Sequence, residues 1–139
     1  MKNGFVDTNI LVYAAGKALE DRRKNQIARE ILLLPRLSLS VQVLSEFIAT
    51  ARNPKKLNLS RDQETKWLRE WFEFKIGAVT FLTFQKAIEM HLRNQLSHWD
   101  SLILAAAIES RCEVLYSDDL QHGQRIEGVQ VINPFLEAP

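Results

Sequence analysis

The sequence predicts an α/β fold in which a mostly parallel sheet is covered by helices on both faces. Short apolar runs alternate along the chain with longer segments whose apolar residues recur at helical spacing, and this alternation is typical of parallel sheets. The chain has 139 residues, of which 46% are hydrophobic, so it can bury a core without disulfide bonds or a structural metal. It contains no internal repeat, low-complexity tract or long linker, and we therefore expect one domain over residues 1–139.

Five short apolar runs are expected to form the strands of this sheet. Each has the length of a strand and gives way to polar or turn-forming residues. The expected strands are residues 4–6, 37–39, 78–82, 114–116 and 129–132.

In the first part of the chain, helices are expected after each strand. The first covers residues 10–15, and the second is an amphipathic helix over residues 19–34 that Pro35 ends, because proline cannot continue a helix. Ser40 is suited to cap a third helix that ends before Asn53, since a serine hydroxyl satisfies free amide groups at a helix start.

Three further helices are expected in the rest of the chain. One covers residues 60–75 and carries acidic residues in its first turns, where the helix dipole favours negative charge. Another runs from Thr83 to about Asn94. Ser97 opens the last, which is apolar on nearly every side as far as Ile108 and must therefore be buried.

The net charge of the chain conceals an uneven distribution. The chain holds 18 Lys and Arg against 17 Asp and Glu, a net charge of +1, which by itself argues against a nucleic-acid partner because phosphate binding needs surplus positive charge on one face. However, residues 1–75 hold 14 basic and 9 acidic side chains, and residues 76–139 hold 4 and 8. The two halves therefore carry opposite charge.

The single cysteine, Cys112, excludes a disulfide framework and a cysteine-based zinc site. We interpret it as a buried small residue. Residues 1–6 lack the pattern of a signal peptide, and no apolar run approaches the roughly 20 residues of a membrane span. These features favour a cytoplasmic protein with no membrane partner.

Acidic residues stand where an α/β sheet binds its ligands, outside the carboxyl ends of the strands. Asp7 directly follows the first expected strand, and Asp118 and Asp119 follow the fourth. Glu46 and Asp100 lie on helices beside apolar residues. These acids are therefore candidates for one shared site.

Each acid also has a purely structural explanation. Asp7 can cap the helix that follows it, and Asp118 or Asp119 can cap a turn. Glu46 falls at the border of an apolar arc, where a solvated side chain is the simpler reading. Asp100 lies in the first turn of a helix, where capping and the helix dipole both favour an acid.

If the acids converge, they need a counter-charge, because carboxylates repel one another and lose solvation when they are brought together. A hard divalent cation such as Mg²⁺ or Mn²⁺ removes this conflict, since it takes carboxylate oxygens and keeps several water molecules. A site of this kind suits phosphodiester hydrolysis, in which the metal polarises a phosphoryl oxygen and lowers the pKa of a bound water.

Four short motifs carry these acids in order along nearly the whole chain. They are Phe5-Val6-Asp7-Thr8-Asn9, Leu44-Ser45-Glu46-Phe47, His98-Trp99-Asp100-Ser101 and Ser117-Asp118-Asp119-Leu120. The quartet resembles that of the PIN-domain family, and most of all that of the VapC-type toxins of prokaryotic toxin–antitoxin pairs. The resemblance implies a three-layer α/β/α sandwich with a mostly parallel central sheet, and an endoribonuclease that uses Mg²⁺ or Mn²⁺.

The resemblance also assigns roles to individual residues. The matching catalytic acids are Asp7, Glu46, Asp100 and Asp119. The same acids are the matching metal ligands, together with Asp118, and which of Asp118 and Asp119 lies closer to the metal is left open. Supporting positions in the motifs are Thr8, Asn9 and Ser117. As partners, the resemblance implies an RNA substrate, a second copy of the chain in a homodimer, and a cognate antitoxin that places a basic side chain among the acids.

Two rival functions are weaker. A catalytically silent PIN-fold interaction module is disfavoured because every acid of the quartet is present. A phosphoacceptor signalling domain needs an aspartate after a central strand and a lysine after a later one, and the expected strands offer neither.

Other conspicuous residues have ordinary explanations. The three histidines match no zinc spacing and are expected at the surface or in caps. An aromatic stripe on one helix is expected to be mainly core, with part of it free for a partner: Trp67, Leu68, Trp71 and Phe72. Two groups of basic residues are candidates to contact an RNA backbone: Arg22, Arg23 and Lys24, and Arg52, Lys55, Lys56 and Arg61.

Overall fold

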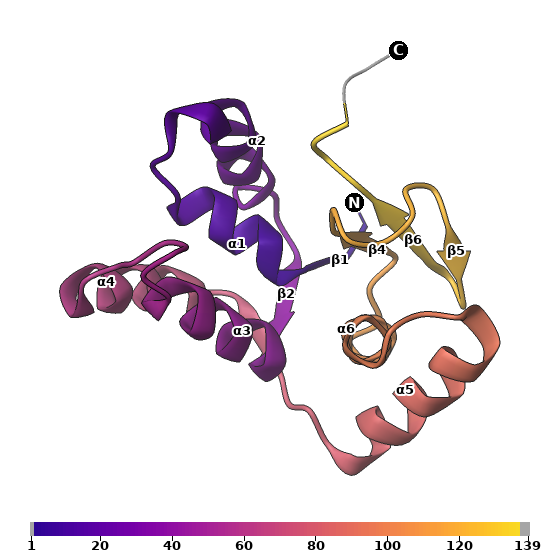
Figure 1. Cartoon of the computed structure of the whole chain (residues 1–139). Helices are drawn as coiled ribbons and strands as arrows, with labels where there is room; N and C mark the ends of the chain where they lie inside the picture. Colours follow the sequence, from indigo (N-terminus) through magenta and orange to yellow (C-terminus); the bar gives the residue numbers. More distant parts are fainter. Residues whose placement is uncertain (1, 137–139) are drawn as a thin grey trace.

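The computed structural model describes residues 2–136 and has the predicted α/β architecture (Figure 1). Met1 and residues 137–139 belong to the predicted domain but lie outside the described residues. The strands are β1 (Gly4–Val6), β2 (Leu37–Ser40), β3 (Lys75–Gly77), β4 (Val114–Tyr116), β5 (Arg125–Ile126) and β6 (Val129–Ile132). The α-helices are α1 (Thr8–Ala15), α2 (Arg22–Ile31), α3 (Val41–Arg52), α4 (Arg61–Trp71), α5 (Phe81–Asn94) and α6 (His98–Glu109).

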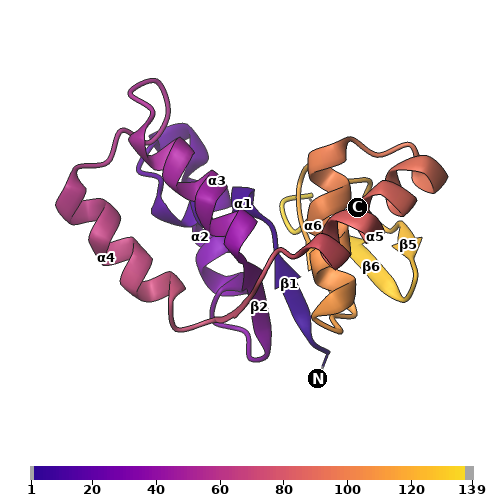
Figure 2. The same ribbon diagram turned by 90° about the horizontal axis from the view of Figure 1, so that it is seen from below.

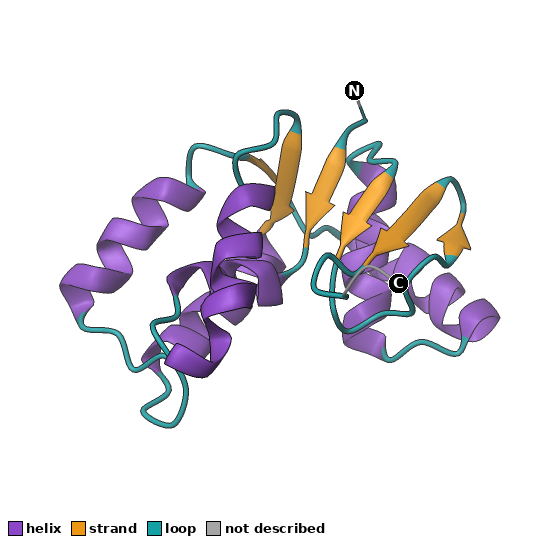
Figure 3. Ribbon diagram, turned by 90° about the horizontal axis from the view of Figure 1, so that it is seen from above, coloured by secondary structure: helices purple, strands orange, loops and turns teal. Residues whose placement is uncertain are grey.

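The strands form one sheet in the order β3-β2-β1-β4-β6-β5. All neighbouring pairs are parallel except β5 and β6, which are antiparallel. The chain moves outward from β1 to β3 and then crosses back to β4 on the other side of β1. Since such crossovers are right-handed, the reversal places α1 to α4 on one face of the sheet and α5 and α6 on the other (Figures 1 and 3). The predicted three-layer sandwich is confirmed.

The predicted caps at Ser40 and Ser97 are confirmed, and serine caps explain where several helices begin. The hydroxyl oxygens of Ser40, Ser60 and Ser97 each accept a hydrogen bond from a backbone amide in the first turn of α3, α4 and α6. At Ser60 the bond is reciprocal, because the Gln63 side chain accepts from the Ser60 amide. Local sequence therefore fixes these helix starts.

The predicted strand over residues 78–82 is wrong. The third strand is β3, which lies just before it, and residues 81–82 form the start of α5 rather than part of a strand. The reason is the pair Thr80 and Thr83, whose side chains each accept a hydrogen bond from the other's backbone amide in a capping box. The same shift shortens the predicted helix 60–75, which ends at Trp71.

Two other predictions need smaller corrections. The predicted helix 19–34 is a short 3₁₀ turn at Leu19–Asp21 followed by α2, and it ends three residues early. The short strand β5 was missed. It pairs with β6 across a tight hairpin whose two central residues, Glu127 and Gly128, both have positive φ angles, as expected for a two-residue turn between antiparallel strands.

The core lies on both faces of the central strands. The side chains of Phe5, Leu39 and Leu115 are fully buried, and α6 is buried against the sheet, as its apolar sequence predicts. An exception on α6 is Trp99, whose side chain is 63% exposed. Over residues 2–136, none of the helices combines the length and apolar character needed to cross a membrane.

Candidate functional site

The candidate site lies at the carboxyl ends of β1 and β4, the two neighbouring strands at which the order of strands in the sheet reverses. Val6 pairs with Tyr116 at the ends of these strands, so the next residues, Asp7 and Ser117, stand side by side. Ser117 donates a hydrogen bond from Oγ to Asp7 Oδ2 at 2.7 Å. Ligands in open α/β sheets bind at this kind of reversal point, as the sequence predicts.

Asp7 is a buried carboxylate whose two oxygens both accept hydrogen bonds. Its side chain is 3% exposed, and Oδ1 accepts from the backbone amide of Thr8 at 2.7 Å. Asp7 thus caps α1, as the structural explanation proposed, while also facing the other acids. Burial raises its pKa from 3.8 to about 7 against the lowering effect of the bonds from Ser117 and Thr8, and the nearby charges of Asp119 and Glu46 add to the rise.

Glu46 is held in place by two donors from different helices. Thr8 on α1 donates from its hydroxyl to Glu46 Oε2 at 2.7 Å, and Gln42, one turn earlier on α3, donates from Nε2 to Oε1 at 2.9 Å. The alternative explanation of Glu46 as a freely solvated side chain does not describe it fully, because the side chain is half-buried and bonded across to α1. Sequence reasoning missed Gln42, although its i, i+4 spacing from Glu46 is a usable signal.

Asn9 organises the motif that follows β4. Its Nδ2 donates to Asp119 Oδ2 at 3.2 Å, and its Oδ1 accepts from the backbone amide of Asp118 at 3.4 Å. The Asp119 amide in turn donates to Ser117 Oγ at 3.1 Å. The Asp118 carboxyl has a raised pKa, mainly from burial and from the charge of Asp119.

Asp100 approaches the other acids from the opposite face of the sheet. Its backbone amide donates to Ser97 Oγ at 3.1 Å, so the predicted cap at the start of α6 is present. Its pKa is raised by partial burial and, against the lowering effect of Ser97, by the charges of Asp119 and Glu46. Because Asp7 feels the same two charges, the four predicted acids share one electrostatic environment. Asp119, rather than Asp118, is the acid of the β4 motif that acts on both Asp7 and Asp100.

The chemistry of these oxygens is compatible with a hard divalent cation. Among residues 2–136, no three Asp, Glu, His or Cys side chains form a ready-made metal cluster. Mg²⁺ usually keeps several water molecules and needs only one or two direct carboxylate ligands, so a closed protein cage is not required. Burial and two like charges disfavour the ionised form of Asp7. A cation would therefore offset the largest electrostatic penalty at this residue.

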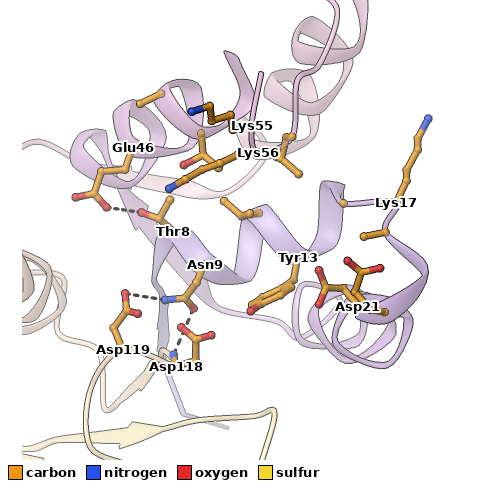
Figure 4. A pocket seen from close by; sticks show the side chains of 17 residues that line it. Thr8, Asn9, Tyr13, Lys17, Asp21, Glu46, Lys55, Lys56, Asp118 and Asp119 are labelled. Carbon is orange, nitrogen blue, oxygen red and sulfur yellow. Dashed lines mark hydrogen bonds between the residues drawn. The ribbon is translucent and has the colours of Figure 1, made fainter. Parts of the chain in front are cut away.

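A cleft of about 900 Å³ runs from these acids along α1 (Figure 4). Glu46, Asp118 and Asp119 line one end. The remainder of the cleft carries three exposed lysines, Lys17, Lys55 and Lys56. Within residues 2–136, none of the three forms an ion pair with an acidic side chain. Figure 4 shows Lys56 extending from the loop after α3 toward Thr8 and Glu46. Glu20 and Asp21, which follow Lys17 in the chain, also line this cleft. We therefore call Glu46, Asp118 and Asp119 the acidic end of the cleft, and the loop that carries Lys55 and Lys56 its basic end.

The basic residues predicted to contact RNA fall into two groups, those that already have partners within the protein and those that line the cleft. Arg52 forms an ion pair with Glu64 at 2.7 Å, and Arg23 donates to the carbonyl of Phe135. The Lys24 ammonium lies 4.9 Å from the centre of the Tyr13 ring. Only Lys55 and Lys56 of the predicted groups line the cleft, and Lys17 was missed because it stands alone in the sequence.

The other residues considered from the sequence lie away from the acids' hydrogen-bond network. Cys112 is buried, as predicted. His122 accepts from the Asn133 amide in a turn, and His98 lies between the rings of Phe84 and Trp99. The aromatic stripe is split: its central member, Trp71, is core and stacks on Trp67, whereas Phe72 is 59% exposed.

Comparisons with known proteins agree with this architecture. A search of curated proteins gives no match. A toxin–antitoxin complex from Klebsiella pneumoniae has a chain that is 22% identical, with a TM-score of 0.72 over 96% of this chain and 98% of that chain. VapC20 of Mycobacterium tuberculosis, described as a toxin that cleaves the sarcin–ricin loop, is 18% identical with a TM-score of 0.65 over 83% and 88%. A DNA-bound VapBC from Salmonella typhimurium is 19% identical with a TM-score of 0.65 over 94% and 97%.

At these identities the structural matches establish the fold. The sequence itself adds an independent result, because the model of the PIN domain matches residues 4–124, a range that includes every acid of the site. The chain therefore belongs to the PIN domain family.

Proposed function

We propose that the protein is an endoribonuclease that depends on Mg²⁺ or Mn²⁺ and acts as the toxin of a toxin–antitoxin pair. One observation carries the proposal. Thr8 binds Asp7 through its amide and Glu46 through its hydroxyl, and Ser117 joins Asp7 to the Asp119 amide, so hydrogen bonds bring these acids together. The charges of Glu46 and Asp119 also act on Asp100. Carboxylates brought together repel one another and lose solvation, and a cation with a phosphodiester substrate gives such a group a use.

Asp7, Asp100 and Asp119 are the residues that would hold the metal, with Glu46 and Asp118 beside them. When bound, the metal would supply a water molecule of lowered pKa and stabilise negative charge on the phosphoryl group. The chain's own contribution is orientation. Ser117 and the Thr8 amide fix Asp7, and Asn9 directs the Asp119 carboxylate toward the same space.

Glu46 is a suitable acceptor for a proton from the attacking water. Its two oxygens already accept from Thr8 and Gln42, and a carboxylate has further acceptor positions on each oxygen. These bonds hold the ionised form in one orientation, which general base catalysis requires. Thr8 therefore serves both acids, since its amide binds Asp7 and its hydroxyl binds Glu46.

The basic end of the cleft is suited to the RNA backbone. Lys55 and Lys56 lie in the loop after α3, which is held by a bond from the Lys55 amide to Asn53 Oδ1 at 2.9 Å and from the Leu59 amide to the Ala51 carbonyl at 2.8 Å. Exposed lysines on a fixed loop attract phosphates without reading bases. RNA would therefore be drawn along α1 toward the acids.

An antitoxin is the proposed regulatory partner, because the similar structures from Klebsiella and Salmonella are toxin–antitoxin assemblies. A second, more apolar groove of about 960 Å³ between α2 and α4 is lined by Trp67, Trp71 and Lys17. Trp71 Nε1 is buried without a hydrogen-bond acceptor among the described residues. Because Lys17 also lines the cleft, one antitoxin segment could occupy the groove and continue to the acids. This function places the protein in the cytoplasm, as the sequence suggests.

The test is cleavage of total RNA by the purified protein with Mg²⁺ or Mn²⁺ and with a chelator. We expect discrete fragments with metal and none with chelator, and none from Asp7→Asn. Asp62→Asn is the matched control, since Asp62 lies in the exposed first turn of α4, and it should cleave like the wild type. Metal-independent cleavage, or full activity of Asp7→Asn, would contradict the proposal.

A further inference from the structure

Gln42 joins two helices that approach the candidate site from opposite faces of the sheet. It lies in the first turn of α3, and Figure 2 shows α3 and α6 on either side of β1. Its Nε2 donates to Glu46 Oε1 at 2.9 Å, within α3, and to the carbonyl of Trp99 in the first turn of α6 at 3.4 Å. One side-chain amide therefore contacts an acid of the site and the helix that carries another acid, Asp100.

The peptide unit between Trp99 and Asp100 is held at both of its polar atoms. Its carbonyl accepts a hydrogen bond from Gln42, and its amide donates to Ser97 Oγ at 3.1 Å. Because a peptide unit is planar and rigid, these two bonds fix the point at which the Asp100 side chain leaves α6.

The amide of Gln42 has one possible orientation, because both of its neighbours are acceptors. In this orientation Oε1 is buried and has no donor among the described residues. A buried acceptor without a partner lowers the stability of a fold, so packing alone would not favour glutamine here. The start of α3 does not require it either, since Ser40 already caps this helix through the Val43 amide. What distinguishes glutamine at this position is therefore the donor side of its amide.

The bonds of Gln42 complete a continuous series of hydrogen bonds that connects three acids of the site. The Thr8 amide donates to Asp7 Oδ1 and the Thr8 hydroxyl donates to Glu46 Oε2, both at 2.7 Å. Gln42 then links the other oxygen of Glu46 to the peptide unit before Asp100. Glu46 is thus held from α1 through one oxygen and connected to α6 through the other.

We propose that Gln42 is a positioning residue that sets the place of the Glu46 carboxylate relative to Asp100. This role rests on the proposed function, in which Glu46 accepts a proton from the attacking water and Asp100 holds the metal. Both acids must act on the same phosphodiester, and Gln42 acts on the reaction through them. Loss of a residue that orients such groups commonly lowers metal affinity or activity by about 10- to 100-fold. Gln42 is not among the residues that line the cleft, so its loss should leave the contacts to the RNA backbone unchanged.

The first measurement is steady-state cleavage of RNA by Gln42→Met, which keeps the length of the side chain and removes the donor. We expect kcat to fall by about 10- to 100-fold with KM for RNA unchanged, because an interaction needed only in the transition state is lost. Gln42→Glu keeps the shape of glutamine but presents an oxygen to two acceptors, so it should lose at least as much activity. A role in packing alone predicts the reverse order, since glutamate resembles glutamine more closely than methionine does.

Gln26→Met is the matched control. Gln26 also donates to a glutamate four residues further on, Glu30, at 3.4 Å, but this pair is exposed on α2, and the variant should keep the wild-type kcat. Circular dichroism checks the fold of each variant. We expect Gln42→Met to fold, because it removes the buried acceptor that has no donor among the described residues. If it does not fold, the kcat of Gln42→Glu decides.

The second measurement, amide hydrogen exchange over residues 98–102 of the metal-free protein, needs no enzymatic activity. These residues form the start of α6. They should exchange several-fold faster in Gln42→Met than in the wild type or in Gln26→Met, because the bond to the Trp99 carbonyl no longer holds this turn against local opening.

A wild-type kcat in Gln42→Met, or unchanged exchange at the start of α6, would overturn the proposal. A lower kcat with unchanged exchange would show that Gln42 acts on Glu46 alone and not on the placing of Asp100. If the wild type itself cleaves no RNA, the proposed function is contradicted, and the role of Gln42 in the reaction is contradicted with it. Faster exchange in Gln42→Met would then still show that Gln42 holds α6, so the two failures are distinguishable.

Discussion

The two ends of the cleft are built in opposite ways. At the acidic end, short side chains such as Asp7 and Ser117 are buried and held by hydrogen bonds of 2.7 Å. At the basic end, Lys55 and Lys56 are exposed, and only the backbone beneath them is fixed. Catalysis requires groups held in fixed positions, and burying carboxylates to fix them lowers the stability of the fold. Attraction of a polyanion requires only exposed positive charge on one side of the cleft.

If this contrast is right, Asp7→Asn separates activity from stability. We expect RNA cleavage to fall by about 10³-fold or more, while the folded protein is at least as stable as the wild type, because a buried ionisable group becomes a neutral one of the same shape. Cleavage rates and urea unfolding at pH 7.5 check both halves. A variant that is inactive only because it unfolds would break the contrast.

The pH dependence of stability sharpens the same point. Between pH 3.8 and about 7, folded Asp7 keeps a proton that the unfolded chain has lost, so the stability of the metal-free wild type should fall as pH rises through this window and then level off. The full effect corresponds to about 4 kcal/mol. Asp7→Asn should show a much smaller decline, because the raised pKa values of Asp100 and Asp118 still contribute to it. Asp62→Asn should keep the full decline, as measured by urea unfolding with chelator present. A decline of equal size in Asp7→Asn would rule out Asp7 as its source.

Ser117→Ala should have a smaller effect, because Ser117 acts through Asp7. We expect a loss of about 10- to 100-fold in cleavage. The bond from Ser117 lowers the pKa of Asp7, so the acidic limb of the pH–rate profile should also move to higher pH. Ser45→Ala is the control, since the Ser45 hydroxyl bonds only to a carbonyl on its own helix. An unmoved profile would show that the bond does not tune Asp7.

The basic end should give the smallest effect and one of a different kind. Changing Lys55 and Lys56 to Gln should weaken RNA binding several-fold and reduce the salt dependence of log K by about 0.7 per lysine, with little change in the rate at saturating RNA. Arg52→Gln, which removes a residue already paired with Glu64, should leave the salt dependence unchanged. Filter binding at several salt concentrations measures this. Equal salt slopes for the wild type and both variants would show that Lys55 and Lys56 do not contact the RNA backbone.

Local signals explain which parts of the fold and site were predictable. Strand ends and serine caps depend on a few neighbouring residues, and these predictions are confirmed apart from the strand over residues 78–82. The roles of the four acids stay predictions. The strand predicted over residues 78–82 failed because Phe81 and Leu82 resemble strand residues, whereas the bonds between Thr80 and Thr83 start a helix. Apolar residues on the exposed side of α5, such as Phe81 and Leu92, contributed to this error, since a helix apolar on both sides lacks the usual amphipathic pattern.

Residues that act across elements were less visible in the sequence. Gln42 and Lys17 join the site because α3 and the end of α1 both border the cleft, which depends on the packing of α1 against α3. The sequence also left open the choice between Asp118 and Asp119. The bond from Asn9 to Asp119, together with the effect of the Asp119 charge on both Asp7 and Asp100, favours Asp119 as the residue nearer the other acids.

The central claim is that the acidic end binds a divalent cation through Asp7. Calorimetric titration of the RNA-free protein with Mn²⁺ near pH 6.5, in buffers of different ionisation enthalpy, tests it most directly. The wild type should bind Mn²⁺ and release protons, because Asp7, with a pKa of about 7, must ionise to act as a ligand. Asp7→Asn should bind far more weakly and without that release. Equal affinity and equal proton release in the two proteins would contradict the claim.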